Sequence, residues 1–272
     1  MTLRSERPAA AGVVLAGGRS SRMGRPKAWL EWHGSTLLHR AAAVLARSVA
    51  GPVVVVAAPG QELPPLPPDV SVVEDPVEGL GPMQGLAAGL AAVADRAGAA
   101  FVCSTDMPFL HPAFVRRVLR ALPAGADVVL PVARGFRQPL AAAYRTSLAR
   151  LIDDLLAEGD LRPGMLFKHC EVVQLDDGQL LADAELARLD PALESVVNVN
   201  SPDDYAMARA RPQPEIVVEH DRRPHRVRSA TLGAAATAVG LGLHRDVVVT
   251  LNGDRVTPDE WLPLVTGDTV TF

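Results

Sequence analysis

The amino-acid sequence predicts an α/β protein with a mainly parallel sheet, followed by a small α+β domain. Short apolar runs alternate with helical segments of about 10–15 residues, which is typical of βαβ units. A glycine-rich basic loop follows the first apolar run. The pattern of apolar and polar residues changes after a proline-containing stretch at 210–215. The chain has 272 residues, of which 48% are hydrophobic, so it can bury the core of one ordinary domain and one small domain.

Local patterns place the elements of the first domain. Apolar runs bounded by glycine or proline are predicted strands, and Ala- and Leu-rich runs after a capping residue are predicted helices. The strands are 12–16, 53–58, 70–74, 99–104, 126–131, 139–144 and 171–175. The helices are the run after Ser35 and Thr36, the run from Pro82 to about Arg96, 111–122 and the run after Ser201. We expect these elements to form one domain over residues 1–210.

Residues 215–272 are predicted to form a second domain. Residues 216–228 resemble a hairpin with a basic turn, and 231–242 is a short Ala-rich helix. The segment 246–257 contains Asn-Gly between two apolar runs, which is a strong hairpin signal, and 267–272 is a last strand. This β-β-α-β-β order favours a separate α+β unit.

Composition excludes several classes of protein. The net charge is −4, which disfavours a general nucleic-acid binder. Cys103 and Cys170 lack a CxxC partner, and the seven histidines have no zinc-site spacing. The N-terminal sequence lacks the apolar core of a signal peptide, and no uncharged apolar stretch reaches ~18 residues. We therefore expect a cytoplasmic protein with no membrane or nucleic-acid partner.

The segment LAGGRSSRMGRPK, residues 15–27, carries the strongest signal for chemistry. Gly17 and Gly18 follow a buried strand and permit close approach of a ligand to backbone N–H groups. Arg22 and Lys27 can then neutralise charge on a leaving pyrophosphate. The spacing is neither that of a Walker A loop nor GxGxxG, which disfavours an ATPase and a dinucleotide oxidoreductase. The alternative is a surface turn with solvated arginines.

Two further segments follow predicted strands. In DPVEGLGPMQGL, Asp75 can accept hydrogen bonds from a base or ribose, while Gly81 and Gly85 let the backbone approach a flat ring. A plain turn and helix start explains the same residues equally well. In STDMP, Asp106 follows the carboxyl end of a strand, where α/β sheets bind ligands, and is a natural magnesium ligand. A turn aspartate before Pro108 is the alternative.

The last segment is VVNVNSPDD, residues 196–204. Asn198 and Asn200 alternate on one face of an extended stretch, so their amide oxygens can supplement a metal site or hold a phosphate. Ser201 is expected to cap the following helix.

Together, LAGG-x3-RMG-x2-K, D-x5-GPMQG, STDMP and NVNSP resemble the molybdenum cofactor guanylyltransferases over about residues 10–210. The resemblance implies a Rossmann-like nucleotidyltransferase domain that transfers GMP from GTP to the terminal phosphate of molybdopterin, with magnesium, and releases pyrophosphate. It implies nucleotide contacts by Leu15, Gly17 and Gly18, phosphate contacts by Arg22 and Lys27, base or ribose contacts by Asp75, Gly81 and Gly85, magnesium at Asp106, and the second substrate near Asn198 and Asn200. Proteins of cofactor synthesis or acceptor proteins are further expected partners.

One departure concerns the nucleobase. The family often has an asparagine near the end of its second strand, where this chain has Ala57-Ala58. Gly17-Gly18 and Gly85 match the guanylyl branch and leave room for a purine. The alternatives are cytidylyl transfer, another phosphorylated acceptor, or a nucleotide-binding regulator that acts through its second domain.

Residues 215–272 resemble a ubiquitin-like β-grasp domain of the sulfur-carrier type. The Asn252-Gly253 turn, the segment 258–261 and the strand entry Gly267-Asp268 carry this likeness. Sulfur carriers use a C-terminal Gly-Gly, whereas this sequence ends in Thr271-Phe272. We expect a domain without carrier chemistry that docks a partner of cofactor synthesis or packs against the transferase domain; a relic without a role is the alternative.

Overall fold

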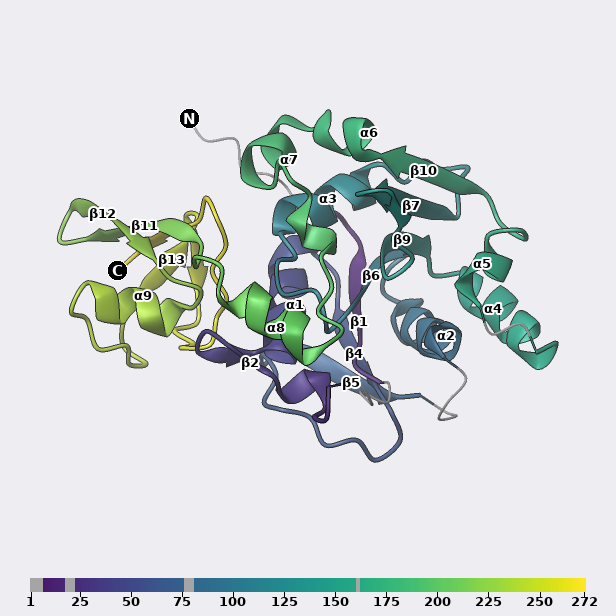
Figure 1. Cartoon of the computed structure of the whole chain (residues 1–272), viewed down its shortest axis with the longest axis horizontal. Coiled ribbons are helices and arrows are strands. Elements are labelled where there is room, and N and C mark those ends of the chain that lie inside the picture. Colours follow the sequence, from purple (N-terminus) through teal and green to yellow (C-terminus); the bar gives the residue numbers. More distant parts are fainter. Residues whose placement is uncertain (1–6, 18–22, 76–80, 160–161) are drawn as a thin grey trace.

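A large mixed sheet forms the centre of the molecule (Figure 1). The computed structural model describes residues 7–17, 23–75, 81–159 and 162–272. The strands of this sheet are β1 (Ala11–Leu15), β4 (Val53–Ala57), β5 (Val70–Glu74), β6 (Ala99–Ser104), β7 (Val128–Ala133), β8 (Phe136–Arg137), β9 (Ala141–Arg145) and β10 (Val172–Asp176). Their order is β10-β7-β9-β6-β1-β4-β5, with β8 paired to β7. Strand β9 runs antiparallel to β6 and β7, whereas β6, β1, β4 and β5 are mutually parallel, so the mainly parallel sheet is confirmed.

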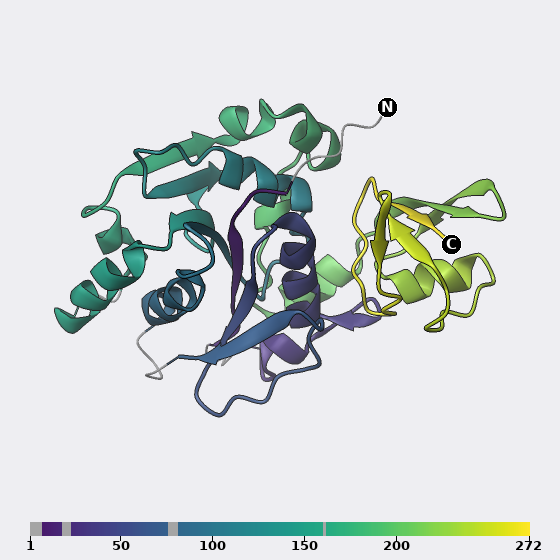
Figure 2. The same cartoon turned by 180° about the vertical axis from the view of Figure 1, so that it is seen from behind.

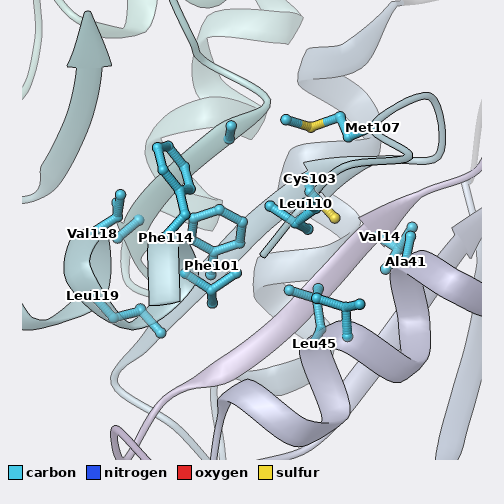
Figure 3. Packing of buried hydrophobic residues seen from close by; sticks show 14 of the residues in the cluster. Val14, Ala41, Leu45, Phe101, Cys103, Met107, Leu110, Phe114, Val118 and Leu119 are labelled. Carbon is cyan, nitrogen blue, oxygen red and sulfur yellow. The ribbon is translucent and has the colours of Figure 1, made fainter. Parts of the chain in front are cut away.

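Helices cover both faces of this sheet. The first core lies under α1 (Leu37–Ser48) and α3 (Pro112–Arg120), with α6 (Asp177–Leu181) and α7 (Ala184–Leu189) at its margin. The second lies under α2 (Pro82–Val93), α4 (Leu148–Ala157) and α5 (Pro163–Leu166). Figure 3 shows Phe101 and Phe114 edge to face in the first core, with ring centroids 6.3 Å apart. No helix in the described part of the chain is both long and apolar enough to cross a membrane.

Capping residues explain where several helices begin. Thr36, not Ser35, caps α1, because its hydroxyl accepts a hydrogen bond from the His39 N–H at 3.2 Å. Ser201 caps α8 (Pro202–Arg209) in a reciprocal capping box, as expected. Helix α2 ends at Val93, short of the expected Arg96, because the chain continues into tighter turns, with Arg96 N donating to Val93 O at 3.0 Å.

Several elements were not predicted from the sequence. They include α4 to α7, the small hairpin β2 (Glu31–Trp32) and β3 (Ser35–Thr36), and the short helices η1 (Lys27–Trp29) and η2 (Glu194–Val196). Most are short. Helix α4 has Ser147 at its N-cap position, although the serine side chain makes no capping hydrogen bond.

The C-terminal region builds its own sheet and core. Its elements are β11 (Glu215–His220), β12 (Arg223–Arg228), α9 (Leu232–Ala238), β13 (Val249–Leu251), β14 (Asp254–Val256) and β15 (Thr269–Thr271). The strand order is β12-β11-β15-β13-β14, and β11 and β15 are parallel. Both hairpins turn through left-handed residues, with φ of 51° and 59° at Asp221-Arg222 and 54° and 87° at Asn252-Gly253.

This C-terminal region packs beside α1, at one end of the long axis (Figures 1 and 2). Arg47 of α1 forms a two-point ion pair with Asp268 and donates to the carbonyl of Pro263 at 3.0 Å. The buried Arg40 donates to Pro108 O at 2.6 Å and to Leu264 O at 3.4 Å, so it joins three segments through carbonyl oxygens. Burial, and then the charge of Arg47, lowers the pKa of Arg40 to about 10, which leaves it charged at neutral pH.

Candidate active site

A cavity lies where β1, β4 and β6 end. Strands β4 and β6 flank β1 on opposite sides, and the carboxyl ends of such strands form the usual ligand crevice of open α/β sheets. The cavity volume is about 920 Å³, enough for a nucleotide. It is lined by nine of the candidate residues: Leu15, Gly17, Lys27, Asp75, Gly81, Gly85, Asp106, Asn198 and Asn200. The remaining two, Gly18 and Arg22, lie outside the described residues.

Lys27 connects two of the sequence segments. Its Nζ lies 2.8 Å from Oδ2 of Asp106 and 3.1 Å from Oδ1 of Asn200. The other carboxylate oxygen of Asp106 accepts a hydrogen bond from Ser104 Oγ. The side chains of Lys27 and Asp106 are 19% and 14% exposed, so their attraction is only partly screened by water.

The backbone explains why Asn198 and Asn200 both line the cavity. Val199, between them, is fully buried, and its N–H donates to the carbonyl of Asp106 at 2.9 Å. In extended chain the neighbours of a buried residue point to the opposite side. The two asparagines therefore share one face and are held beside the Asp106 loop.

The oxygen atoms around Lys27 fit a magnesium ion. Asp106 and Asn200 direct side-chain oxygens at one cation, here the lysine ammonium group, and hard divalent cations prefer such ligands. Among the described residues, no group of three or more His, Cys, Asp or Glu side chains could hold a metal. A metal here would share its coordination with substrate phosphates, as Mg²⁺ commonly does at phosphoryl-transfer sites.

Glycines shape the opposite wall. A Cβ atom on Gly17 would lie 3.3 Å from the backbone nitrogen of Ala58, which keeps β1 and β4 close where they end. A Cβ atom on Gly85 would lie 3.4 Å from Leu15 and 3.9 Å from Oδ2 of Asp75. Gly81 has a φ of 76°, a conformation that favours glycine. The wall is thus flat backbone with one carboxylate, which suits a base and ribose.

Gln61 also lines the cavity, although no sequence motif marks it as a site residue. Its Oε1 accepts from Ala58 N at 2.9 Å, and its Nε2 donates to Ala16 O at 3.1 Å. Gln61 therefore ties the end of β4 to the start of the glycine loop. Its position after Pro59-Gly60 was the only local signal, and a turn does not reveal which strand end the side chain reaches.

The cysteines do not contribute a nucleophile. Cys103 is fully buried, and burial, with the charge of Asp106, raises the pKa of its thiol. Burial raises the pKa of Cys170 to about 11. Neither thiol is a reactive thiolate at neutral pH.

The sheet order, with a cavity at the strand ends, is that of an α/β nucleotidyltransferase fold. The chain belongs to the family of the MobA-like NTP transferase domain, whose model matches residues 12–172. That match ends before the C-terminal sheet begins.

Two mycobacterial proteins and one solved structure illustrate what the chain is similar to. A probable molybdenum cofactor guanylyltransferase of Mycobacterium tuberculosis is 44% identical over 170 residues, which are 61% of this chain and 82% of the relative. Its counterpart in Mycobacterium marinum is 41% identical over 189 residues, or 67% and 92% of the two chains. The solved structure of molybdopterin-guanine dinucleotide biosynthesis protein A from Archaeoglobus fulgidus is 25% identical with a TM-score of 0.55, over 73% of this chain and 96% of that one.

Proposed function

We propose that this protein transfers GMP from GTP to the terminal phosphate of molybdopterin in the cytoplasm and releases pyrophosphate. The observation that carries the proposal is the convergence of Lys27, Asp106 and Asn200 in a nucleotide-sized cavity. The names of the relatives supply the base and the acceptor.

The reaction makes modest demands on acid–base chemistry. An oxygen of the acceptor phosphate attacks the α-phosphorus of GTP, and the bond from that phosphorus to the bridging oxygen of the β-phosphate breaks. The acceptor oxygen is already ionised near neutral pH, so no strong base is required. The protein has to align two anions and offset their repulsion, which is electrostatic work.

Each candidate residue has a proposed part in that work. Lys27, with Arg22, stabilises the charge that develops on the leaving pyrophosphate. Asp106 and Asn200 hold magnesium, which supplies charge stabilisation at the reacting phosphates when bound. Asn198 orients the acceptor beside it. The assignments of Lys27, Asp106, Asn198 and Asn200 rest on their place in the lining of the cavity, whereas that of Arg22 rests on the sequence motif alone.

We propose GTP rather than CTP as the donor, because glycine at 17 and 85 leaves space for a purine. Gln61 hydrogen-bonds the backbone at the strand end where the sequence has Ala57-Ala58. Gln61 therefore stabilises the cavity wall at the end of β4, where this chain lacks the asparagine that is common in the family.

A direct experiment distinguishes the donors. The protein is incubated with molybdopterin, magnesium and each nucleoside triphosphate separately, and the products are weighed by mass spectrometry. We expect a guanine dinucleotide and pyrophosphate with GTP. A cytosine dinucleotide formed faster than the guanine product would replace the proposal by cytidylyl transfer. No product with any triphosphate or phosphorylated acceptor would favour a nucleotide-binding regulator.

We further infer that residues 1–210 and 215–272 are separate domains, and that the second is a ubiquitin-like β-grasp domain that docks a partner of cofactor synthesis. Its strand order, with the first and last strands parallel at the centre and one helix in the crossover, supports the β-grasp assignment. Removal of the chain after Arg211 tests the docking role. Full activity of the truncated protein in cells as well as in vitro would contradict it.

A further inference from the structure

Strand β12 is an open edge of the C-terminal sheet, and it lies at the outer end of the molecule (Figures 1 and 2). Its partner β11 turns the backbone groups of Val217 and Glu219 towards β15, since Val217 N donates to Asp268 O and Phe272 N donates to Glu219 O. The β11 residues that alternate with these two, such as Ile216 and Val218, therefore direct their backbone hydrogen bonds to β12. Ser229 N donates to Pro214 O, which fits this alternation.

This pattern determines which groups of β12 face outwards. His225 pairs with Val218, and Val227 pairs with Ile216. The backbone N–H and C=O groups of these two β12 residues are therefore hydrogen-bonded to β11. The backbone N–H and C=O groups of Arg226 and Arg228 point to the free edge. Pro224 shares that orientation and lacks an N–H, as is usual for a proline on an open edge. The free edge therefore offers the backbone N–H donors and C=O acceptors of two residues, Arg226 and Arg228.

The same edge is strongly basic. The chain enters β12 through Arg222 and continues to Arg228. The arginine side chains of this stretch are all exposed: Arg222, Arg223, Arg226 and Arg228. Arg226 and Arg228 are 79% and 59% exposed although both pair with Glu215. This density of positive charge contrasts with the net charge of −4 of the whole chain.

Charge and edge geometry together select the occupant. A second copy of β12 would bring arginines directly opposite arginines, which is unfavourable. A nucleic acid could use the charges, but it does not pair with backbone donors and acceptors at strand spacing. An extended peptide with acidic side chains satisfies both features.

We propose that β12 binds an acidic, extended segment of a partner protein by strand addition. The segment pairs with the backbone of Arg226 and Arg228, and its carboxylates lie against the guanidinium groups of the basic edge. The proposal deepens the docking role given above and rests on it only for the biological purpose of the contact.

The test uses the full chain and a short peptide of alternating glutamate and valine, blocked at both ends. Amide hydrogen exchange, followed by NMR, is expected to slow at Arg226 and Arg228 when the peptide is added. It should change little at His225 and Val227, which are already bonded to β11. If no binding is seen at millimolar peptide concentration, the proposal is wrong. The arginines would then serve only to prevent aggregation through the open edge.

Matched probes separate backbone pairing from charge. The same peptide N-methylated at two consecutive residues keeps its charge but loses donors on both edges, and should bind at least about tenfold more weakly. Equal binding of the N-methylated peptide or of an oligothymidylate would show a general cationic surface and overturn strand addition. Equal binding of a peptide with lysine in place of glutamate would show that the carboxylates do not contribute, and would overturn the acidic character of the partner.

Variants locate the site and separate it from catalysis. The double variant Arg226→Gln, Arg228→Gln should weaken peptide binding by about tenfold or more, whereas Arg255→Gln on the opposite edge strand β14 should change it less than about twofold. Equal effects of both variants would contradict the location. GMP transfer should be unchanged in all of them. A chain that binds the peptide but transfers no nucleotide would refute only the proposed reaction.

Discussion

The ammonium nitrogen of Lys27 lies 2.8 Å from a carboxylate oxygen of Asp106, although 79 residues separate the two in the chain. One residue follows the glycine loop after β1 and the other follows β6, and these strands are neighbours in the sheet. The contact places a cation and the carboxylate proposed to hold magnesium at one point of the cavity. Substitutions there should impair turnover while leaving the fold intact.

Asp106→Asn should lower the rate of nucleotidyl transfer by at least about 100-fold at saturating magnesium, because charge stabilisation through a metal is a large part of such catalysis. Asparagine keeps the size of the side chain and can still accept from Ser104. Steady-state rates and thermal unfolding measure the two effects separately. Asp153→Asn, on the exposed side of α4, is the matched control. Near-wild-type turnover would remove Asp106 from the site.

Lys27→Ala should reduce kcat by at least about tenfold, because the leaving pyrophosphate loses a positive charge. Lys27→Arg should recover part of this loss, since it keeps the charge but changes the geometry. The measurement is kcat and KM for GTP in both variants. A change confined to KM would show that Lys27 binds ground state and transition state equally.

Gly85→Ser should lower kcat/KM for GTP more than for CTP. The added Cβ lies 3.4 Å from Leu15 and 3.8 Å from Val56, and the hydroxyl beyond it narrows the space for a purine. We expect a change of about tenfold or more in the GTP-to-CTP ratio of kcat/KM. Competition between the two triphosphates measures this ratio directly, and Gly164→Ser, which has open space around its Cβ, controls for the substitution itself. An unchanged ratio would argue against Gly85 as a determinant of base selection.

Asp268→Asn should destabilise the protein by about 3 kcal/mol, because it removes the partner of a largely buried arginine. Burial tends to raise the pKa of Asp268, but the charge of Arg47 and hydrogen bonds from Arg47, Asn252 and the Val265 N–H lower it overall. The ionised form is therefore stabilised by folding. This contribution is present above the unfolded pKa of about 3.9 and is lost as the pH falls through the lower folded value.

Denaturant unfolding at pH 7 and at pH 3 checks this sign. The wild-type protein should lose more stability between the two pH values than Asp268→Asn does, because the variant lacks the titrating group. Asp246→Asn, at an almost fully exposed position, should behave like wild type. Parallel pH profiles for wild type and Asp268→Asn would contradict the assignment.

The site was predictable to different degrees along the chain. Leu15 ends a strand, and Gly17, Asp75 and Asp106 each follow one whose apolar run is visible locally; parallel strands bring their carboxyl ends to one edge. Gln61 was not predictable, because it follows a turn and reaches its partners through a side chain whose direction depends on β1. The short elements α5 to α7 carry too few residues for a helical period.

Local sequence patterns predicted the types of the long elements except α4, the mainly parallel sheet and the sequence segments that line the cavity. Glycines, strand runs and capping residues act within a few positions of one another, so their effect can be read locally. The contacts of Lys27 with Asp106 and Asn200 became visible only in the tertiary structure. The same is true of the hydrogen bonds from Arg40 and Arg47 of α1 to the C-terminal region. Those contacts join residues up to 224 positions apart, and their partners are set by how sheets and helices pack, which no local pattern records.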